Sequence, residues 1–454
     1  MHWPGEHLPT LLADTLRLVA AHEGRTHICT GYTANLDLIV SLDTATIATL
    51  IASVDAARLQ QKIEHPAYVI REPADLWAGL WIQLRDQKGG EWPLEDAATY
   101  RWLREYLPGR PGVGGTGIQA ACALARLGLR PLLNVPWRDR ELLDLLPENV
   151  LITAGGQVLP ATHGQARDPE HQTTVHFILE YARGTTWRLA GQETTATRTD
   201  RFIVPFDPEE REFHIDATFR AASLALPGPK WLLASGFNIP NRSARVFRAI
   251  EEAAAHMQAF RRDPTAQVHL ELGELHQPEI RQRIRDRLFG LATSVGFNEH
   301  ELGVLAGDLG RPKPALDHLP DVVGFCRHVA EVYGLARLNV HTSTYTLALT
   351  RFDPEVEQRA LLLGCATAAF RAWQGDFAPR AQIAAQIAGL PFHPEGVEAG
   401  QALTSTSGLP QSGSSGLRAV LTPAFLCPQQ RQAVGLGDTY TAGVLAAFAC
   451  QAAP

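Results

Sequence analysis

Strand-like and helix-like segments alternate along the second half of the chain, and this alternation limits the possible folds more than any other feature of the sequence. PKWLLASGFN at 229–238 is strand-like and precedes a helical pattern at 241–262, while QVHLELGE at 267–274 precedes a second helical pattern at 278–290. LATSVGFNEHEL at 291–302 then runs from a strand into a helix. Strands that alternate with helices form a parallel sheet with helices on its faces. The sequence therefore predicts an α/β fold.

The first half of the chain begins the same pattern and then departs from it. HICTGYTANLDLIV at 27–40 reads as a strand that ends in a polar loop, and PGVGGTGIQAACALARLGLRPLL at 111–133 reads as a Gly-rich loop, a helix and the next strand. Residues 163–215 are rich in Thr, Val, Phe and Tyr and alternate at period two, which predicts two or three antiparallel strands. Such a β-rich insertion could close over a cleft as a lid.

These patterns predict two domains. The large one is a doubly wound α/β domain, and the small one is a β-rich lid. We assign 1–59, 111–164 and 213–454 to the large domain, and 60–110 and 165–212 to the lid.

Composition excludes several classes of protein. The 454 residues are 45% hydrophobic and 20% charged, with a net charge of −7 and no run of Lys and Arg, which argues against a nucleic-acid binder. No apolar run reaches the roughly eighteen residues of a membrane span. The six cysteines form no CxxC pair, so we expect reduced thiols in a cytoplasmic protein. Nothing in the sequence implies a protein partner.

The run VGLGDT at 434–439 places an acid, Asp438, between two glycines and a threonine, where a predicted β-branched strand gives way to an apolar helix. The first N–H groups of a helix are unpaired and its dipole is positive there, so such a position attracts an anion such as phosphate. Gly435 and Gly437 would let the anion approach the backbone. The alternative is that Asp438 only caps the helix.

Two more acidic motifs end predicted strands. One is the HLE run that ends in Glu271, and the other is NEHE, with Asn298 and Glu301. The C-terminal ends of neighbouring parallel strands line one crevice, and carboxylate and amide oxygens are the ligands that Mg²⁺ prefers. The alternatives are a surface acid for Glu271 and a capping box for Asn298 and Glu301.

The order HxE, NxxE and GxGD resembles that of the ADP-dependent sugar kinases, the glucokinases and phosphofructokinases of the ribokinase superfamily. GYTANLDLIV, VHFILEY, DRFIV, SGFN and HTSTYTLAL match further family segments in the expected order, so the resemblance covers most of the chain. It implies a ribokinase-like fold and transfer of the β-phosphate of ADP to a sugar hydroxyl, which leaves AMP. A catalytically silent sugar-binding protein and an ATP-dependent kinase are the other possibilities.

The resemblance also assigns roles at the donor end of the site. Asp438 would be the catalytic base, with Gly435 and Gly437 in the anion hole. The phosphates would lie along the loop made of Val434, Gly435, Leu436 and Gly437, and Arg201 of DRFIV would reach them from the lid. His341 and Tyr345 fall in the adenine pocket of the family. Mg²⁺ would be held through Glu271, Asn298 and Glu301.

At the acceptor end, the resemblance implies that Asn35, Asp37, Gly114 and Gly115 hold the sugar. Glu91 falls where glucokinases of the family carry a glutamate that binds a sugar hydroxyl, although a solvated loop residue is the alternative. Because Glu91 is present and no cluster of Lys and Arg awaits a sugar phosphate, the sequence favours glucose over fructose 6-phosphate or another acceptor. One departure concerns the Gly–Gly loop, where Thr116 replaces the usual amide after the glycines.

Overall fold

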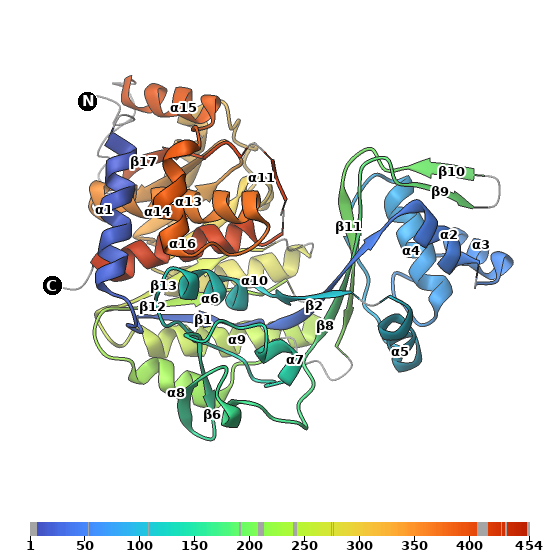
Figure 1. Ribbon diagram of the computed structural model, residues 1–454. Coiled ribbons are helices and arrows are strands. Elements are labelled where there is room, and N and C mark those ends of the chain that lie inside the picture. The colour runs from blue at the N-terminus through green and yellow to red at the C-terminus, as the bar shows by residue number, and fades with distance from the viewer. Residues whose placement is uncertain are drawn as a thin grey trace.

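The computed structural model describes residues 7–52, 54–107, 109–189, 192–207, 213–238, 243–273, 275, 277–405, 416–427, 429–431 and 434–451. Figure 1 shows two lobes of unequal size, joined by long strands that run from the large lobe into the small one. In the described part of the chain, no helix is long and apolar enough to cross a membrane. All six cysteines are free thiols, and five of them are buried.

The large lobe is built on a ten-stranded sheet. Its strands follow the order β17-β16-β15-β14-β13-β12-β1-β5-β6-β7. The central pairs are parallel, whereas β15 to β17 at one edge and β7 at the other are antiparallel. In chain order the strands are β1 (Ile28–Gly31), β5 (Leu132–Leu133), β6 (Leu151–Ala154), β7 (Gln157–Pro160), β12 (Lys230–Ala234), β13 (Ala266–Glu271), β14 (Ser294–Asn298), β15 (Arg337–His341), β16 (Tyr345–Thr350) and β17 (Arg418–Pro423).

Helices cover both faces of this sheet, because successive side chains of each buried strand point to opposite faces. In β12, Trp231 and Leu233 join one apolar cluster, whereas Leu232 and Ala234 join the other. The first cluster contains α1 (Leu8–Ala21), α6 (Thr116–Arg126), α13 (Pro354–Gln374), α14 (Arg380–Gln386) and α16 (Leu436–Gln451). The second contains α8 (Ala217–Ala225), α9 (Ser243–Phe260), α10 (Pro278–Leu288), α11 (Glu299–Asp308) and α12 (Leu319–Tyr333), with α15 (Pro394–Ser405) against it.

The small lobe is a five-stranded sheet backed by helices (Figure 1). Its strands, in sheet order, are β3 (Gly90–Glu91), β11 (Asp200–Phe206), β8 (Val175–Tyr181), β2 (Asn35–Leu42) and β4 (Arg110–Gly114). A β9–β10 hairpin (Thr186–Leu189 and Gln192–Thr195) lies beside it. Besides α1, α6 and α8, the described helices in the first half of the chain are α2 (Thr44–Ile51), α3 (Ala56–Glu64), α4 (Pro73–Arg85), α5 (Ala97–Tyr106) and the short α7 (Arg140–Leu143).

Period-two alternation gives the small sheet two different faces. Leu36, Leu38 and Val40 of β2 are buried in the same apolar cluster as Trp77 and Trp81 of α4. The intervening residues of β2 point to the opposite face, which we call the inner face of the lid. A cavity with walls from both this face and the large lobe shows that it looks toward the large lobe.

The structure confirms the doubly wound α/β fold and the β-rich second lobe, and it differs from the sequence-based prediction in three places. First, the polar half of HICTGYTANLDLIV is not a loop but the lid strand β2, and β4 is also a lid strand, although we assigned most of both to the large domain. Second, β15, β16 and β17 pair antiparallel instead of continuing the alternation. Third, β17 ends at Pro423, so a loop separates the last strand from Asp438.

Candidate active site

Asp438 lies in the first turn of α16, as the sequence predicted. Gly435 just before the helix has a φ of +71°, and a side chain there would collide with Gln119 of α6, so both backbone angle and space require glycine. Burial raises the pKa of Asp438 to about 6, although Arg371 and a hydrogen bond with Thr116 favour its ionised form. Asp438 is therefore a carboxylate that can exchange a proton near neutral pH beside a helix N-terminus.

Glu271, at the end of β13, is the centre of a buried hydrogen-bond network. One of its oxygens contacts His269 Nε2 at 2.8 Å and accepts from Thr441 Oγ1 at 3.0 Å, and the other contacts His341 Nε2 at 3.0 Å. Burial alone would raise the pKa of Glu271, but the two histidines lower it to about 2. Both oxygens therefore have hydrogen-bond partners, and through them Glu271 orients His341 and α16.

This network continues away from the site as a chain of buried polar groups. The other ring nitrogen of His269 contacts Ser294 Oγ at 2.9 Å, and Ser294 accepts from Arg337 Nη1 at 3.0 Å. Arg337 also donates to Glu357 of α13 at 2.8 Å, and both side chains are almost fully buried. Three strands and one helix of the large lobe are thus connected to the carboxylate at the site.

Asn298 and Glu301 form the capping box that the sequence left open as an alternative. Asn298 Oδ1 accepts from the N–H groups of His300 and Glu301, and Glu301 Oε2 accepts from the Asn298 N–H at 2.9 Å. Burial raises the pKa of Glu301 to about 8, and the charges of Glu271 and Asp438 add to this effect. The capping box leaves the second carboxylate oxygen of Glu301 available and commits the side-chain oxygen of Asn298 to the helix.

Whether Mg²⁺ can bind here depends on which side-chain oxygens are available as ligands. Within the described ranges, no group of three or more His, Cys, Asp or Glu side chains is placed to hold a metal ion. The carboxyls of Glu271, Glu301 and Asp438 nevertheless lie close enough to affect one another's pKa. Mg²⁺ commonly binds through one or two carboxylates while keeping waters and substrate phosphates. The residues fit a metal of that kind, approached through Glu301, and do not fit an all-protein cage.

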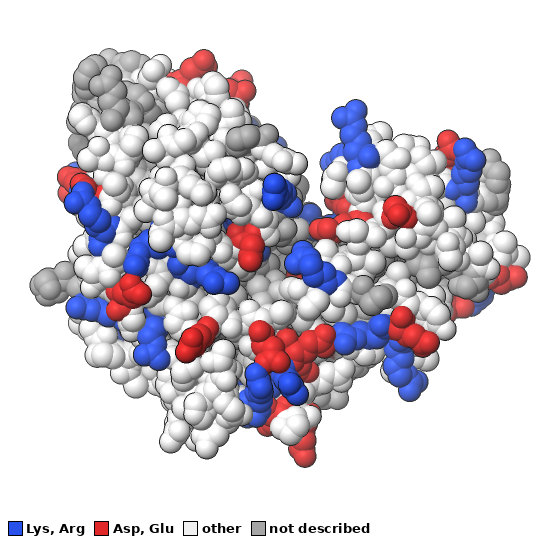
Figure 2. Space-filling view, in the orientation of Figure 1, with Lys and Arg blue, Asp and Glu red and all other residues white. Residues whose placement is uncertain are grey.

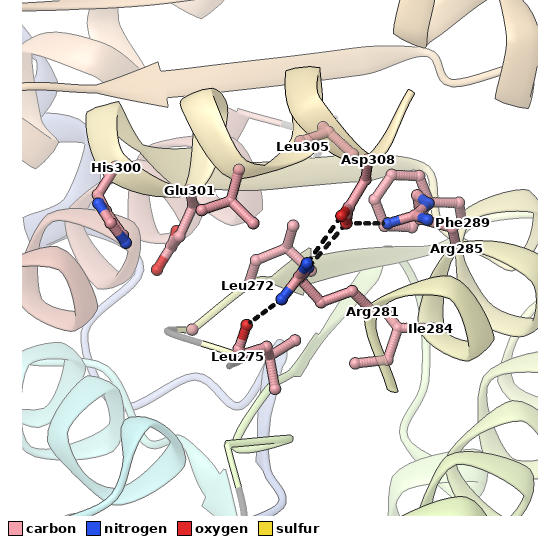
Figure 3. A pocket seen from close by; sticks show the side chains of 12 residues that line it. Leu272, Leu275, Arg281, Ile284, Arg285, Phe289, His300, Glu301, Leu305 and Asp308 are labelled. Atoms are coloured by element: carbon pink, nitrogen blue, oxygen red, sulfur yellow. Dashed lines mark hydrogen bonds and ion pairs between the residues drawn. The ribbon is translucent and has the colours of Figure 1, made fainter. Parts of the chain in front are cut away.

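A cavity of about 230 Å³ lies between α10 and α11 next to this cluster. Figure 3 shows Glu301 and His300 at one end of it, and at the other end Asp308 held by Arg281 and Arg285. Leu272, Leu275 and Ile284 are among the apolar residues between the two ends. Glu301 thus lies at the border between this largely apolar cavity and the cluster of acidic side chains.

The acceptor residues predicted from the sequence lie together on the inner face of the lid. Asn35 Nδ2 donates to Asp37 Oδ1 at 2.8 Å, and Asn35 Oδ1 is buried and has no hydrogen-bond partner among the described residues. A side chain on Gly114 would collide with both residues, and Gly115 has a φ of +91°. Burial raises the pKa of Asp37 to about 7. A buried orphan acceptor beside a carboxyl that readily exchanges a proton is what a polar ligand would satisfy.

Sheet register brings three more residues to this face. His176 pairs with Asp37, and its Nδ1 lies 3.9 Å from Asp37 Oδ1. Burial lowers the pKa of His176 to about 4, so the ring is neutral. Arg201 and Glu91 lie farther along the same face on β11 and β3, and both act on the charge of Asp37. The Nε of Arg201 is buried without a partner, whereas the Glu91 side chain is exposed.

The two lobes enclose a second cavity, of about 330 Å³, beside Asp37. Asp37, Ile178 and Glu180 line it from the lid, and Gln119 and Val434 from the large lobe. Its basic lining residues are Arg110, Arg126 and Arg371. Figure 2 shows the surface hollowed between the lobes, with charges of both signs around the hollow. The premise that no arginine cluster awaits a sugar phosphate is therefore wrong, because these residues are distant in sequence and adjacent in space.

His341 and Tyr345 occupy different places. His341 lies against Gly437, where a glycine Cβ would come within 3.1 Å of the imidazole, so it borders the first turn of α16. Tyr345 is buried and donates from its hydroxyl to the Leu316 carbonyl at 2.8 Å. It also lines a cavity of about 840 Å³ together with Thr342 and Lys313. Tyr345 thus has a structural contact and a place at a cavity that is large enough for a nucleobase.

Sequence analysis missed the side chains that support these residues. Thr116 contacts Asp438, Arg371 contacts the loop before it, and Thr441 binds Glu271. Thr116 was noticed only as a departure from the family pattern. Arg371 and Thr441 lie inside apolar helices, and the only signal of their role in the sequence is that each is a polar residue among apolar ones. That signal does not identify their partners, which lie on other elements far away in the sequence.

Comparison with known proteins agrees with this geometry. Residues 26–447 match the family described as ADP-specific phosphofructokinase/glucokinase conserved region. An ADP-specific phosphofructokinase of Thermococcus kodakarensis is 25% identical over 92% of this chain and 95% of its own length. An ADP-dependent glucose/glucosamine kinase of Pyrococcus furiosus is 24% identical over 90% and 91%. A solved ADP-dependent kinase complex with fructose-6-phosphate and ADPβS shares the fold, with a TM-score of 0.75 and 18% identity over 98% of both chains.

Proposed function

Because the chain belongs to the ADP-specific phosphofructokinase/glucokinase family and is an ADP-dependent sugar kinase, we propose that it transfers the β-phosphate of ADP to fructose 6-phosphate. The observation that carries the proposal is that Asp438, at the N-terminus of α16, contacts Thr116, which directly follows the Gly114–Gly115 pair packed against Asn35 and Asp37. The products would be AMP and fructose 1,6-bisphosphate.

In this proposal Asp438 accepts the proton of the attacking hydroxyl. A pKa of about 6 leaves most of the carboxyl ionised at pH 7 and still basic enough to take up a proton in the transition state. The unpaired N–H groups around Gly435 and Gly437 stabilise the phosphoryl group as charge develops on it. Arg201, a half-buried residue whose Nε atom is buried, provides a guanidinium on the lid side that is suited to phosphate oxygens.

Mg²⁺ remains our proposal for the metal, and when bound it would neutralise charge on the transferred phosphate. Glu301 would hold it through its available oxygen, directly or through water. Glu271 would act by fixing His341, and Asn298 by fixing the helix that carries Glu301. For the adenine we propose the cavity beside Tyr345, and we keep the cytoplasm as the expected location.

The choice of acceptor reverses the preference for glucose drawn from the sequence. Of the two relatives described, the phosphofructokinase matches slightly more closely than the glucose/glucosamine kinase. Independent support comes from the cavity beside Asp37, where Arg110 and Arg126 are exposed and form no ion pair within the described residues. A sugar phosphate brings the dianion that such guanidinium groups bind well. Glucose is the second candidate, favoured by Glu91 on the same inner face.

The test is an acceptor panel with purified protein and Mg²⁺, in which AMP formation from ADP is followed for fructose 6-phosphate and glucose, with ATP as the alternative donor. We expect the highest kcat/KM with ADP and fructose 6-phosphate. Asp438→Asn should lower kcat by about 10² to 10⁴ without loss of fold, because a general base contributes that much. Turnover of that variant near the wild-type rate would remove Asp438 from the mechanism.

Two further variants decide the acceptor. Removing the two exposed cavity arginines (Arg110→Ser with Arg126→Ser) should raise KM for fructose 6-phosphate about tenfold or more and leave glucose kinetics nearly unchanged. Arg101→Ser, which removes an exposed arginine from α5, is the control for net charge. Glu91→Ala should weaken any use of glucose and relax rejection of the phosphate. A wild type that prefers glucose, with the arginine variants unaffected, would return the assignment to glucokinase.

A further inference from the structure

Arg371 of α13 is a buried cation that lines the cavity beside Asp37, and the proposed binding of the acceptor makes no use of it. Its side chain is 5% exposed, and in the described part of the structure it forms no ion pair with any Asp or Glu. Burial lowers its pKa, and the charge of Asp438 is the largest effect that opposes this shift. A buried guanidinium without a direct ion pair is costly, so its position in the middle of an apolar helix calls for a specific task.

The hydrogen bonds of Arg371 converge on the loop that precedes Asp438. Its Nη1 donates to the Gly435 carbonyl at 3.0 Å and to Thr439 Oγ1 at 2.6 Å, and its Nη2 donates to Gln119 Oε1. The guanidinium also stacks 4.0 Å from the centre of the Phe377 ring. One side chain therefore ties α13 to the first turn of α6 and to the first turn of α16.

The contact with Gly435 also orients the next peptide N–H. In a planar trans peptide the C=O of one residue and the N–H of the next point in opposite directions. The Gly435 carbonyl also accepts from the Thr439 N–H at 3.1 Å and from Thr439 Oγ1 at 2.8 Å, so it points into the first turn of α16 and the Leu436 N–H points the opposite way. Because glycine at φ +71° restricts this peptide little by itself, the contact with Arg371 reinforces the orientation that the first turn sets.

The charge of Arg371 also acts on both carboxyls of the reaction centre. It favours the ionised forms of Asp438 and of Asp37, which lie on opposite lobes. The other groups that influence Asp438 are Thr116 of α6, Glu271 of β13, His341 of β15 and Glu301 of α11. Among these, the negative charges of Glu271 and Glu301 oppose the ionisation of Asp438, and the positive charge of Arg371 offsets their effect.

We propose that Arg371 is a positioning residue for phosphoryl transfer, which orients the Gly435–Leu436 peptide of the anion hole and keeps Asp438 able to accept a proton. This inference rests on the proposed role of Asp438. The proposed role of Arg371 has two components. Orientation of the peptide requires the planar guanidinium group, whereas the effect on the charge of Asp438 would be supplied by any cation at this position.

Two substitutions separate these parts. Arg371→Lys keeps the charge but cannot hold the carbonyl, Thr439 and Gln119 together, so kcat should fall about tenfold or more while the acidic limb of the pH profile stays in place. Arg371→Gln removes the charge, so that limb should also move to higher pH by about one to two units. Neither change should raise KM for ADP in proportion to the loss of kcat.

Thr367→Val is the matched control, because Thr367 donates to the Thr439 carbonyl between the same two helices without carrying a charge. It should lower stability without moving the limb. The inference is wrong if the acidic limb of the pH profile of Arg371→Gln lies at the same pH as that of the wild type, or if Arg371→Lys retains the wild-type kcat. Should Arg371→Gln fail to fold, the Arg371→Lys result decides alone. If Asp438→Asn turns over at the wild-type rate, the proposed function is refuted. If Asp438→Asn is inactive but the Arg371 variants keep the wild-type kcat and pH profile, only this inference is refuted.

Discussion

Glu301→Gln should stabilise the metal-free protein, and the gain should grow with pH. The carboxyl is 9% exposed, and burial together with two neighbouring acids raises its pKa to about 8. Glutamine cannot ionise, yet its side-chain oxygen can still accept from the Asn298 N–H, as capping boxes allow. The substitution therefore removes the titration and keeps the helix cap.

The sign and size of the effect follow from linkage. The folded-state pKa lies above the value of about 4.3 for an exposed glutamate, so the folded state binds the proton more tightly. The contribution of Glu301 to stability is complete below about pH 4, declines as the pH rises toward 8, and is then lost. A shift of 3 to 4 units corresponds to at most about 5 kcal/mol, and relaxation of the site brings the expected difference to about 2–4 kcal/mol.

Thermal unfolding of both proteins, followed by circular dichroism from pH 5 to pH 9 with EDTA, measures this difference. The midpoints should nearly coincide at pH 5, and at pH 9 the variant should be higher by about 5 °C. Glu299→Gln removes a carboxylate from the same helical turn without touching the capping box, and it serves as the control. In wild type, Mg²⁺ with ADP should reduce the gap if the cation lies near Glu301. A gap that is constant with pH, or a variant less stable at pH 9, would refute a protonated, buried Glu301.

Three other predictions address the acceptor, the base and the core. Gly114→Ala places a methyl group against Asn35 and Asp37, so KM for the acceptor should rise tenfold or more while KM for ADP stays near wild type; unchanged acceptor kinetics would contradict the close approach. Thr116→Val should move the acidic limb of kcat/KM upward and Thr116→Ser should not, because only valine removes the hydrogen bond to the catalytic carboxyl. Glu357→Gln leaves the fully buried Arg337 without its carboxylate partner and should lower the free energy of unfolding by denaturant by about 3–5 kcal/mol. A decrease of less than about 1 kcal/mol would show that the pair contributes little to stability.

Local patterns were enough to predict the parts of the fold that local physics determines. The βα alternation predicted the parallel sheet, and the helices at 241–262 and 278–290 correspond to α9 and α10. Gly435 and Gly115, which the sequence singled out as places where a ligand approaches the backbone, both have positive φ angles that few other residues adopt. The strand at 35–42 was missed because its alternation of polar and apolar residues was read as a loop, although a half-buried lid strand shows the same alternation.

The rest of the site could not be predicted because it depends on contacts between distant segments. Arg110 and Arg126 share a cavity only because β4 and α6 meet where the two lobes join. The chain from His269 to Glu357 crosses several elements, and no spacing in the sequence reports it. The capping box is a local feature, and the motif NxxE correctly indicated it as one alternative. The motif does not show which oxygen of Glu301 accepts the capping hydrogen bond and which one remains available.

The departure in the Gly–Gly loop illustrates how the structure changes the meaning of a sequence feature. From sequence, Thr116 in place of an amide meant a lost contact to the sugar. In the structure Thr116 contacts Asp438, and Gln119, three residues later on the same face of α6, accepts from Arg371. The first turn of α6 therefore supports Asp438 through the hydroxyl of Thr116 and through the amide of Gln119, which holds Arg371. In the proposed mechanism Asn35 and Asp37 of the lid strand β2 bind the acceptor, so this turn of α6 acts on the proposed base instead of on the sugar.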